Sequence, residues 1–145
     1  MNKPALRSQN LINPVVLALG AALLFAGCAS TKDAKSRNDI ATLKTAHLAF
    51  IDQFTEGAGK TWDDQNLTTS AAAVEKQFSD AEQYEATKKK DTLRRNAIAN
   101  LHSQFKKNVK SLESGKAFYR PKFAAHLKDQ ISENYDQALR GEDIR

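Results

Sequence analysis

Residues 97–112, AIANLHSQFKKNVKSL, carry the pattern that decides the fold. Their apolar side chains recur three or four positions apart, at Ala97, Ile98, Leu101, Phe105, Val109 and Leu112. Because an α-helix turns once in about 3.6 residues, side chains with this spacing line one face of a helix. The stretch therefore predicts an amphipathic helix that must bury its apolar face, and Gly115 predicts its end.

Three more apolar stripes with the same spacing occur in the sequence, two before this helix and one after it. They comprise Ile40, Leu43, His47, Phe50, Ile51 and Phe54; Val74, Phe78, Ala81 and Tyr84; and Phe123, Leu127, Ile131, Tyr135 and Ala138. No run alternates between apolar and polar residues well enough to predict a strand. Amphipathic helices must bury one another's apolar faces, so we predict an all-α fold, a small bundle of three to four helices.

Capping and breaking residues predict the bounds of the first helix. Ser36, with Asp39 three residues later, is the spacing of a capping box at a helix start. Gly57 and Gly59 lie within three residues of each other and predict the end. The mainly polar residues 60–70 are expected to form a connection to the next helix.

The remaining bounds follow from similar signals. The second helix is expected at about residues 71–86, and residues 88–91, KKKD, then interrupt the apolar stripe. This interruption is either a turn or an exposed bend in one long helix, and we favour the turn. Pro121 suits the first turn of the last helix, and Gly141 predicts its end.

The N-terminal region has the composition of a secretory signal peptide. Residues 1–14 include two cations, Lys3 and Arg7, and no acidic residue. Residues 15–26, VVLALGAALLFA, form an uninterrupted apolar run. Its length suits a signal peptide and falls short of the roughly 20 residues that span a bilayer. We therefore predict export and removal of residues 1–27.

The end of this run, Leu24-Phe25-Ala26-Gly27-Cys28, resembles the lipobox of bacterial lipoproteins. It departs from the commonest pattern in having Phe25 where Leu is usual, with Leu24 one position earlier. The resemblance implies signal-peptidase cleavage between Gly27 and Cys28 and a covalent diacylglycerol, usually with a further acyl chain, on Cys28. Two or three acyl chains, at about 0.8 kcal/mol per buried CH₂, anchor a protein stably. No other cofactor is predicted.

The position of Cys28 also bears on compartment and domain organisation. Cys28 could instead be a buried core thiol or part of an uncleaved membrane anchor. Both alternatives are disfavoured, because this one cysteine of the chain lies directly after a segment with the proportions of a signal peptide. Ala29 follows instead of the Asp that retains enteric lipoproteins in the inner membrane. The resemblance thus implies an outer-membrane lipoprotein facing the periplasm. Residues 28–37 are expected to form a flexible tether, and residues 38–145 the bundle domain.

The charge balance limits the partners. The chain has 145 residues and a net charge of +5, of which Lys3 and Arg7 in the leader account for two, leaving +3. This excess is too small to predict nucleic-acid binding, which needs a concentrated basic patch. Arg95, Lys106 and Lys110 fall along one side of the third helix. A solvated surface explains them, and contact with anionic lipid headgroups is the functional alternative.

No motif predicts catalysis or a metal site. His47, His102 and His126 lie on different predicted helices, and none has the Glu-x-x-His spacing of metal sites in helical bundles. We expect His47 to be a hydrogen-bonded residue at the boundary of the apolar face. Asp63 and Asp64 are adjacent carboxylates in a predicted loop, where neighbouring side chains diverge, so a polar loop explains them.

These observations predict a non-enzymatic lipoprotein whose helical bundle binds another envelope protein or the membrane surface. The alternative is a small envelope enzyme, or an enzyme inhibitor, that acts on cell-wall material. The sequence leaves the oligomeric state open.

Overall fold

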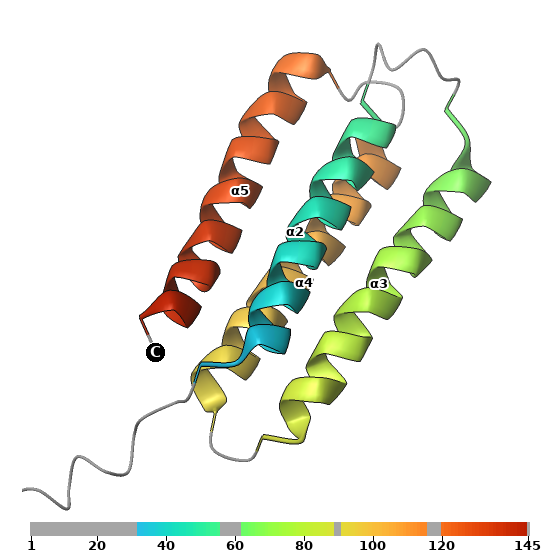
Figure 1. Cartoon of the computed structure of the whole chain (residues 1–145). Coiled ribbons are helices and arrows are strands. Elements are labelled where there is room, and N and C mark those ends of the chain that lie inside the picture. The colour runs from blue at the N-terminus through green and yellow to red at the C-terminus, as the bar shows by residue number, and fades with distance from the viewer. Residues whose placement is uncertain (1–31, 56–61, 89–90, 116–119, 145) are drawn as a thin grey trace, which may run out of the picture.

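The computed structural model describes residues 32–55, 62–88, 91–115 and 120–144. Within these ranges the chain forms four helices and no strand: α2 (Ala34–Gln53), α3 (Asp64–Ala86), α4 (Thr92–Gly115) and α5 (Pro121–Asp143). Successive helices run in opposite directions and lie side by side (Figure 1). The predicted all-α bundle is therefore confirmed.

One apolar core lies among the four helices. Helix α2 packs against both α3 and α5, and α4 packs against α3, whereas the contact between α4 and α5 is less extensive than any of these. Phe78, Phe105 and Tyr135 are the largest fully buried side chains. Each large apolar side chain contributes roughly 1.5–3 kcal/mol when it leaves water, so this core accounts for most of the favourable free energy of folding.

The first helix begins earlier than predicted. The side chain of Asp33 accepts a hydrogen bond from the backbone N–H of Ser36 at 3.1 Å and so caps the N-terminus of α2. The predicted capping box of Ser36 with Asp39 is wrong, because Ser36 is a buried helical residue. Residues 34–37, expected in the tether, thus belong to α2. The predicted end signals of this helix, Gly57 and Gly59, lie outside the described residues.

The second helix also begins earlier than predicted. Asp63 accepts hydrogen bonds from the backbone N–H groups of Gln65 (2.9 Å) and Asn66 (3.1 Å), so α3 begins at Asp64. Leu67 is buried in the core. The expectation that residues 60–70 form only a connection is therefore wrong from residue 64 onward. The Asp63 cap stabilises the first turn of α3, and the burial of Leu67 holds that turn against the core.

The turn between α3 and α4 is confirmed, because α3 ends at Ala86 and α4 begins at Thr92. Asp91 accepts a hydrogen bond from the backbone N–H of Arg94 at 3.0 Å, so a carboxylate cap starts α4 without any glycine or proline. Pro121 is the first residue of α5, as predicted. Gly141 does not end α5, which continues to Asp143.

None of the described helices combines the length and apolar character needed to cross a membrane. The predicted signal peptide, residues 1–27, and the predicted lipid attachment site, Cys28, lie outside the described residues.

Candidate functional site

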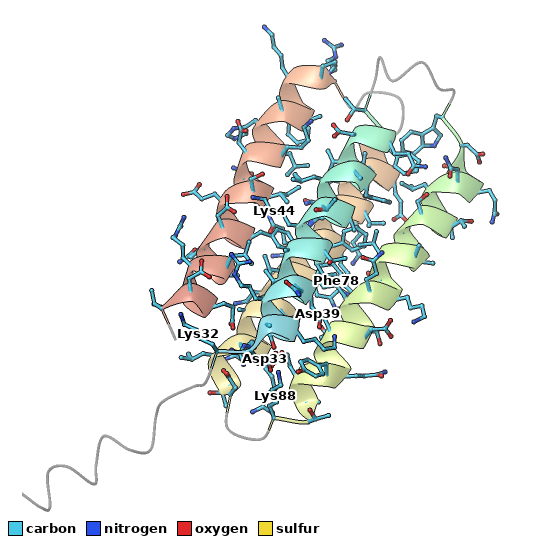
Figure 2. All side chains as sticks on the ribbon, viewed as in Figure 1. Lys32, Asp33, Asp39, Lys44, Phe78 and Lys88 are labelled. Carbon is cyan, nitrogen blue, oxygen red and sulfur yellow. The ribbon has the colours of Figure 1, made fainter. Side chains whose placement is uncertain are left out.

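Polar and charged side chains from the ends of all four helices and the residues next to them meet at the end of the bundle where α2 begins. We call this group the tether-end cluster; it comprises Asp33, Ser36, Glu85, Lys88, Asp91, Arg94 and Glu142. The Lys88 ammonium donates hydrogen bonds to Asp33 and, at 2.9 Å, to the Ser36 hydroxyl, which donates in turn to Glu85. Figure 2 shows Asp33 and Lys88 close together at this end. The first residues of α2 are thereby fixed to the end of α3.

Hydrogen bonds within the cluster keep Asp33 and Lys88 charged. Burial acts to raise the pKa of Asp33, but hydrogen bonds from Lys88, the Ser36 backbone and Tyr84 hold that pKa well below its usual value. The pKa of Lys88 is raised despite burial, because it donates to Asp33. Its ammonium also lies 3.7 Å from the centre of the Tyr84 ring. The pair therefore stays ionised over the physiological pH range.

A buried ion pair joins α4 to α5 at the same end. Arg94 donates to Glu142 from Nε at 2.8 Å and from Nη2 at 2.5 Å, and the two residues are 2 % and 4 % exposed. Arg94 Nη1 also lies 2.8 Å from Asp91. This bidentate geometry is the strongest form of a charge-assisted hydrogen bond. The hydrogen bond to Glu142 raises the pKa of Arg94, so the guanidinium is always charged.

The three predicted surface-contact residues do not gather at this end. Arg95, Lys106 and Lys110 lie along α4 over a length of about 22 Å, at a rise of about 1.5 Å per residue. Lys106 Nζ is 3.8 Å from Glu75 Oε2 on α3, whereas Lys110 is exposed. The row therefore follows the axis of the bundle, and its contact with anionic lipid stays a prediction.

His47 is hydrogen-bonded, as predicted, but it lies in the core and not at its boundary. Its Nδ1 is 3.3 Å from the hydroxyl of Tyr135, and its Nε2 is 3.0 Å from Nδ2 of Asn108. Phe105 packs edge-on against the ring at 5.0 Å between centroids. Burial lowers the pKa of His47 to about 4 and raises that of Tyr135, so both are neutral at pH 7.

The other two histidines have separate surroundings. His102 lies between two carboxylates, with Nε2 at 2.5 Å from Glu75 and Nδ1 at 2.7 Å from Glu82. Its ring stacks on Phe78 at 4.6 Å. His126 is exposed on α5. Among the described residues, no group of three histidine, cysteine or acidic side chains is placed to hold a metal ion.

The adjacent carboxylates Asp63 and Asp64 have structural roles. Asp63 caps α3, and Asp64 accepts a hydrogen bond from the indole N–H of Trp62 at 2.7 Å. The two side chains therefore turn to different partners, and nothing in their contacts resembles a catalytic acid–base pair.

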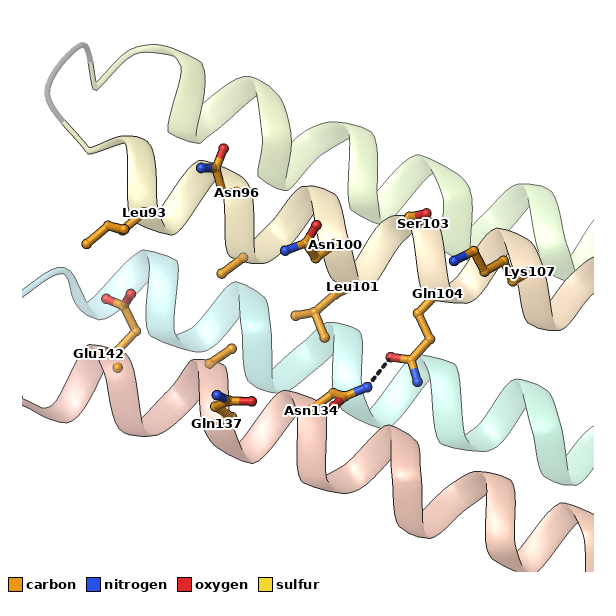
Figure 3. A pocket seen from close by; sticks show the side chains of 13 residues that line it. Leu93, Asn96, Asn100, Leu101, Ser103, Gln104, Lys107, Asn134, Gln137 and Glu142 are labelled. Carbon is orange, nitrogen blue, oxygen red and sulfur yellow. Dashed lines mark hydrogen bonds between the residues drawn. The ribbon is translucent and has the colours of Figure 1, made fainter.

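A groove of about 780 Å³ lies between α4 and α5, where the two helices make less contact. Its inner lining is apolar or small, and is formed by Ala97, Leu101, Ala138 and Gly141. Its outer lining is dominated by amide side chains, those of Asn96, Asn100, Gln104, Asn134 and Gln137. Figure 3 shows Leu101, Gln104 and Asn134 in the space between the two helices, with Leu93 and Glu142 at one end and Lys107 at the other. The chain thus has an open groove along one side whose lining is mainly uncharged, with Glu142 and Lys107 at its two ends.

Two contacts hold this groove at a fixed width. The ion pair of Arg94 with Glu142 closes its tether end, and Asn134 donates to the side-chain oxygen of Gln104 at 3.2 Å farther along. Small residues between these contacts leave the space unfilled. The side chains of Asn96, Asn100 and Gln137 make no hydrogen bond to another described residue, so water or a ligand meets them.

No known protein family matches the chain, and no curated protein or solved structure is significantly similar to it. The function must therefore be inferred from the chemistry of these residues.

Proposed function

We propose that the chain is a lipid-anchored lipoprotein of the bacterial envelope whose helical bundle binds another envelope protein without catalysis. The observation that supports it is the shortness of the link to Cys28. Helix α2 is capped by Asp33, only five residues after that cysteine. An extended chain spans at most about 3.6 Å per residue, so the link reaches no farther than about 18 Å. Acyl chains on Cys28 would thus hold the tether end of the bundle beside the headgroups.

The charge distribution favours a protein partner over the membrane surface. At the tether end, Lys88 and Arg94 face carboxylates, and Arg37 Nε lies 2.9 Å from Asp143. Cations that are already paired in this way attract anionic headgroups less. The row formed by Arg95, Lys106 and Lys110 follows the bundle axis, so only one end of it would reach the bilayer if the bundle stands upright. The sides of the bundle would remain open to a partner.

The arrangement of acids and bases favours binding over the alternative of an enzyme acting on cell-wall material. Within the described residues, the only carboxylate that lines the groove is that of Glu142; it is 4 % exposed and accepts two hydrogen bonds from Arg94. His47 is fully buried among core residues. A general acid or base must reach a substrate within hydrogen-bond distance, but the Glu142 carboxylate is already held by Arg94 and His47 lies away from the groove.

Replacement of the cysteine tests the anchor. Cells supplied with labelled palmitate should label the wild-type protein, and Cys28→Ser should lose both the label and lipoprotein-type processing. Ser30→Ala, two residues away, should keep both. Density-gradient fractionation should place the labelled protein in the outer membrane. If Cys28→Ser were labelled and processed like the wild type, the lipoprotein proposal would be wrong.

A further inference from the structure

We propose that the groove between α4 and α5 binds a short segment of a partner protein in extended conformation. The segment is uncharged along its length and has a carboxylate at the end beside Lys107. This inference rests on the proposed function only for the location of the partner, because the groove is lined by residues of α4 and α5 and not by the link to Cys28.

The dimensions of the groove fit such a segment. On α4 its lining runs from Leu93 to Lys107, fourteen residues apart, which is about 21 Å along the helix. An extended chain rises about 3.3 Å per residue, so this length takes about six residues. The volume of about 780 Å³ lies within the usual range of ligand pockets.

The amide side chains match the polar groups of an extended backbone. Each Asn or Gln offers one acceptor oxygen and a donor NH₂, and each peptide group offers one donor and one acceptor. Asn96 and Asn100, whose side chains make no hydrogen bond to another described residue, are four residues apart, a spacing of about 6 Å along α4. Peptide groups on one edge of a strand repeat every two residues, at about 6.6 Å. Gln137 on α5 faces the other edge, and a segment that reaches Lys107 displaces the hydrogen bond between Asn134 and Gln104.

The same lining disfavours other occupants. A helix pairs its own N–H and C=O groups internally, so a row of amide side chains would have little backbone to bind. The C–H faces of sugar rings pack best on aromatic side chains, and the described lining contains none. The amide row therefore favours an extended polypeptide.

The charges at the two ends of the groove are unequal. At the tether end, Glu142 already accepts two hydrogen bonds from Arg94. At the far end, Lys107 makes no ion pair with another described residue. The groove thus has one uncompensated cation, which a ligand carboxylate would complement. A Cβ added at Gly141 would meet nothing within 4 Å, so the inner lining leaves room for a backbone to approach closely.

The test uses a display library of random 12-residue peptides with free C-termini, selected on the full-length protein in detergent micelles. Enriched peptides should share a short uncharged segment with a carboxylate at one end. A synthetic copy should bind about tenfold more weakly to Asn100→Ala/Gln137→Ala, which removes two hydrogen-bonding side chains. The matched control Gln77→Ala/Gln83→Ala alters exposed amides on α3 and should bind normally.

Two further measurements address the backbone and the carboxylate. N-methylation of alternate peptide bonds in the synthetic peptide should weaken binding at least tenfold, because it removes the backbone donors along one edge. Lys107→Met, or amidation of the ligand carboxylate, should weaken binding severalfold, and the two changes together should be no worse than either alone.

Several outcomes would overturn the proposal. They are the absence of any enriched peptide, equal binding to the groove variant and the control variant, selected peptides that are helical when bound, or displacement of the peptide by purified cell-wall fragments. Cys28→Ser should bind the peptide as the wild type does. Failure of the anchor would therefore leave this result unchanged, and the two proposals fail separately.

Discussion

The tether-end cluster and the groove both connect α4 to α5 through polar side chains, but their polar atoms meet different partners. In the cluster, charged side chains are buried or half-buried and are paired with one another, as Arg94 is with Glu142 and Lys88 with Asp33. In the groove, uncharged amides such as Asn100 face solvent. Polar groups that are satisfied within the chain fix the structure, whereas those left to water are available to a ligand. The comparison therefore separates the part that holds the bundle together from the part that can bind.

The largest expected effect comes from breaking the buried ion pair. Arg94→Met removes the bidentate partner of Glu142 and leaves its carboxylate buried without compensation, which should lower the free energy of unfolding by about 3–5 kcal/mol. Urea denaturation followed by circular dichroism measures this loss. The double variant Arg94→Met/Glu142→Met should recover much of it, because the buried Glu142 charge is removed as well, although Asp91 still loses its contact with Arg94.

Lys76→Met provides the control for this prediction. Its ion pair with Asp80 spans one turn of α3 and is 75 % and 59 % exposed, so its loss should cost less than about 1 kcal/mol. If Arg94→Met were no more destabilised than Lys76→Met, the paired charges of the tether-end cluster would not be what holds this end of the bundle together.

The second prediction concerns the buried His47, whose pKa burial lowers from 6.5 to about 4. Below pH 6.5 the unfolded chain binds a proton at this site and the folded chain does not, so stability falls as pH drops from about 6.5 to 4. Between pH 7 and pH 5 the loss should be about 2 kcal/mol. His47→Gln keeps a polar side chain that does not titrate, and its free energy of unfolding should lack this contribution.

Denaturation of both proteins at pH 7 and pH 5 isolates the effect as the difference between their pH dependences, because the carboxylates are common to both. Equal pH dependences would show that His47 is protonated in the folded chain or that its surroundings admit water. This pH sensitivity would lie in the core, apart from both the tether-end cluster and the groove.

Much of the fold could be predicted, because apolar residues spaced three or four positions apart indicate which face of a helix is buried. The stripe around Phe105 and the stripe around Ile131 both lie in the core, and Pro121 begins α5. The helix starts were less predictable, because a cap depends on which carboxylate meets a free N–H. Asp33 and Asp63 cap α2 and α3, although Ser36 offered an equally good local pattern.

The candidate sites were harder to predict, since they depend on pairs of helices. Asn108 precedes Val109 of the apolar stripe on α4, and only the packing of the helices brings its side chain to His47. The regular spacing of Asn96, Asn100 and Gln104 on the polar face is visible in the sequence. It does not reveal a groove, because the groove exists only where small residues on α5 lie opposite.

The smallest effect is expected at Gly141, inside α5 and on the groove lining. Glycine costs a helix about 0.5–1 kcal/mol relative to alanine, and an added Cβ here would meet nothing within 4 Å. Gly141→Ala should therefore stabilise the protein by about that amount in urea denaturation. Ala138→Gly, one turn earlier in the same helix, is the matched control and should destabilise it similarly. A loss of stability in Gly141→Ala would mean that the backbone at this position is not free helix. A gain would show that the glycine has no role in holding α4 against α5.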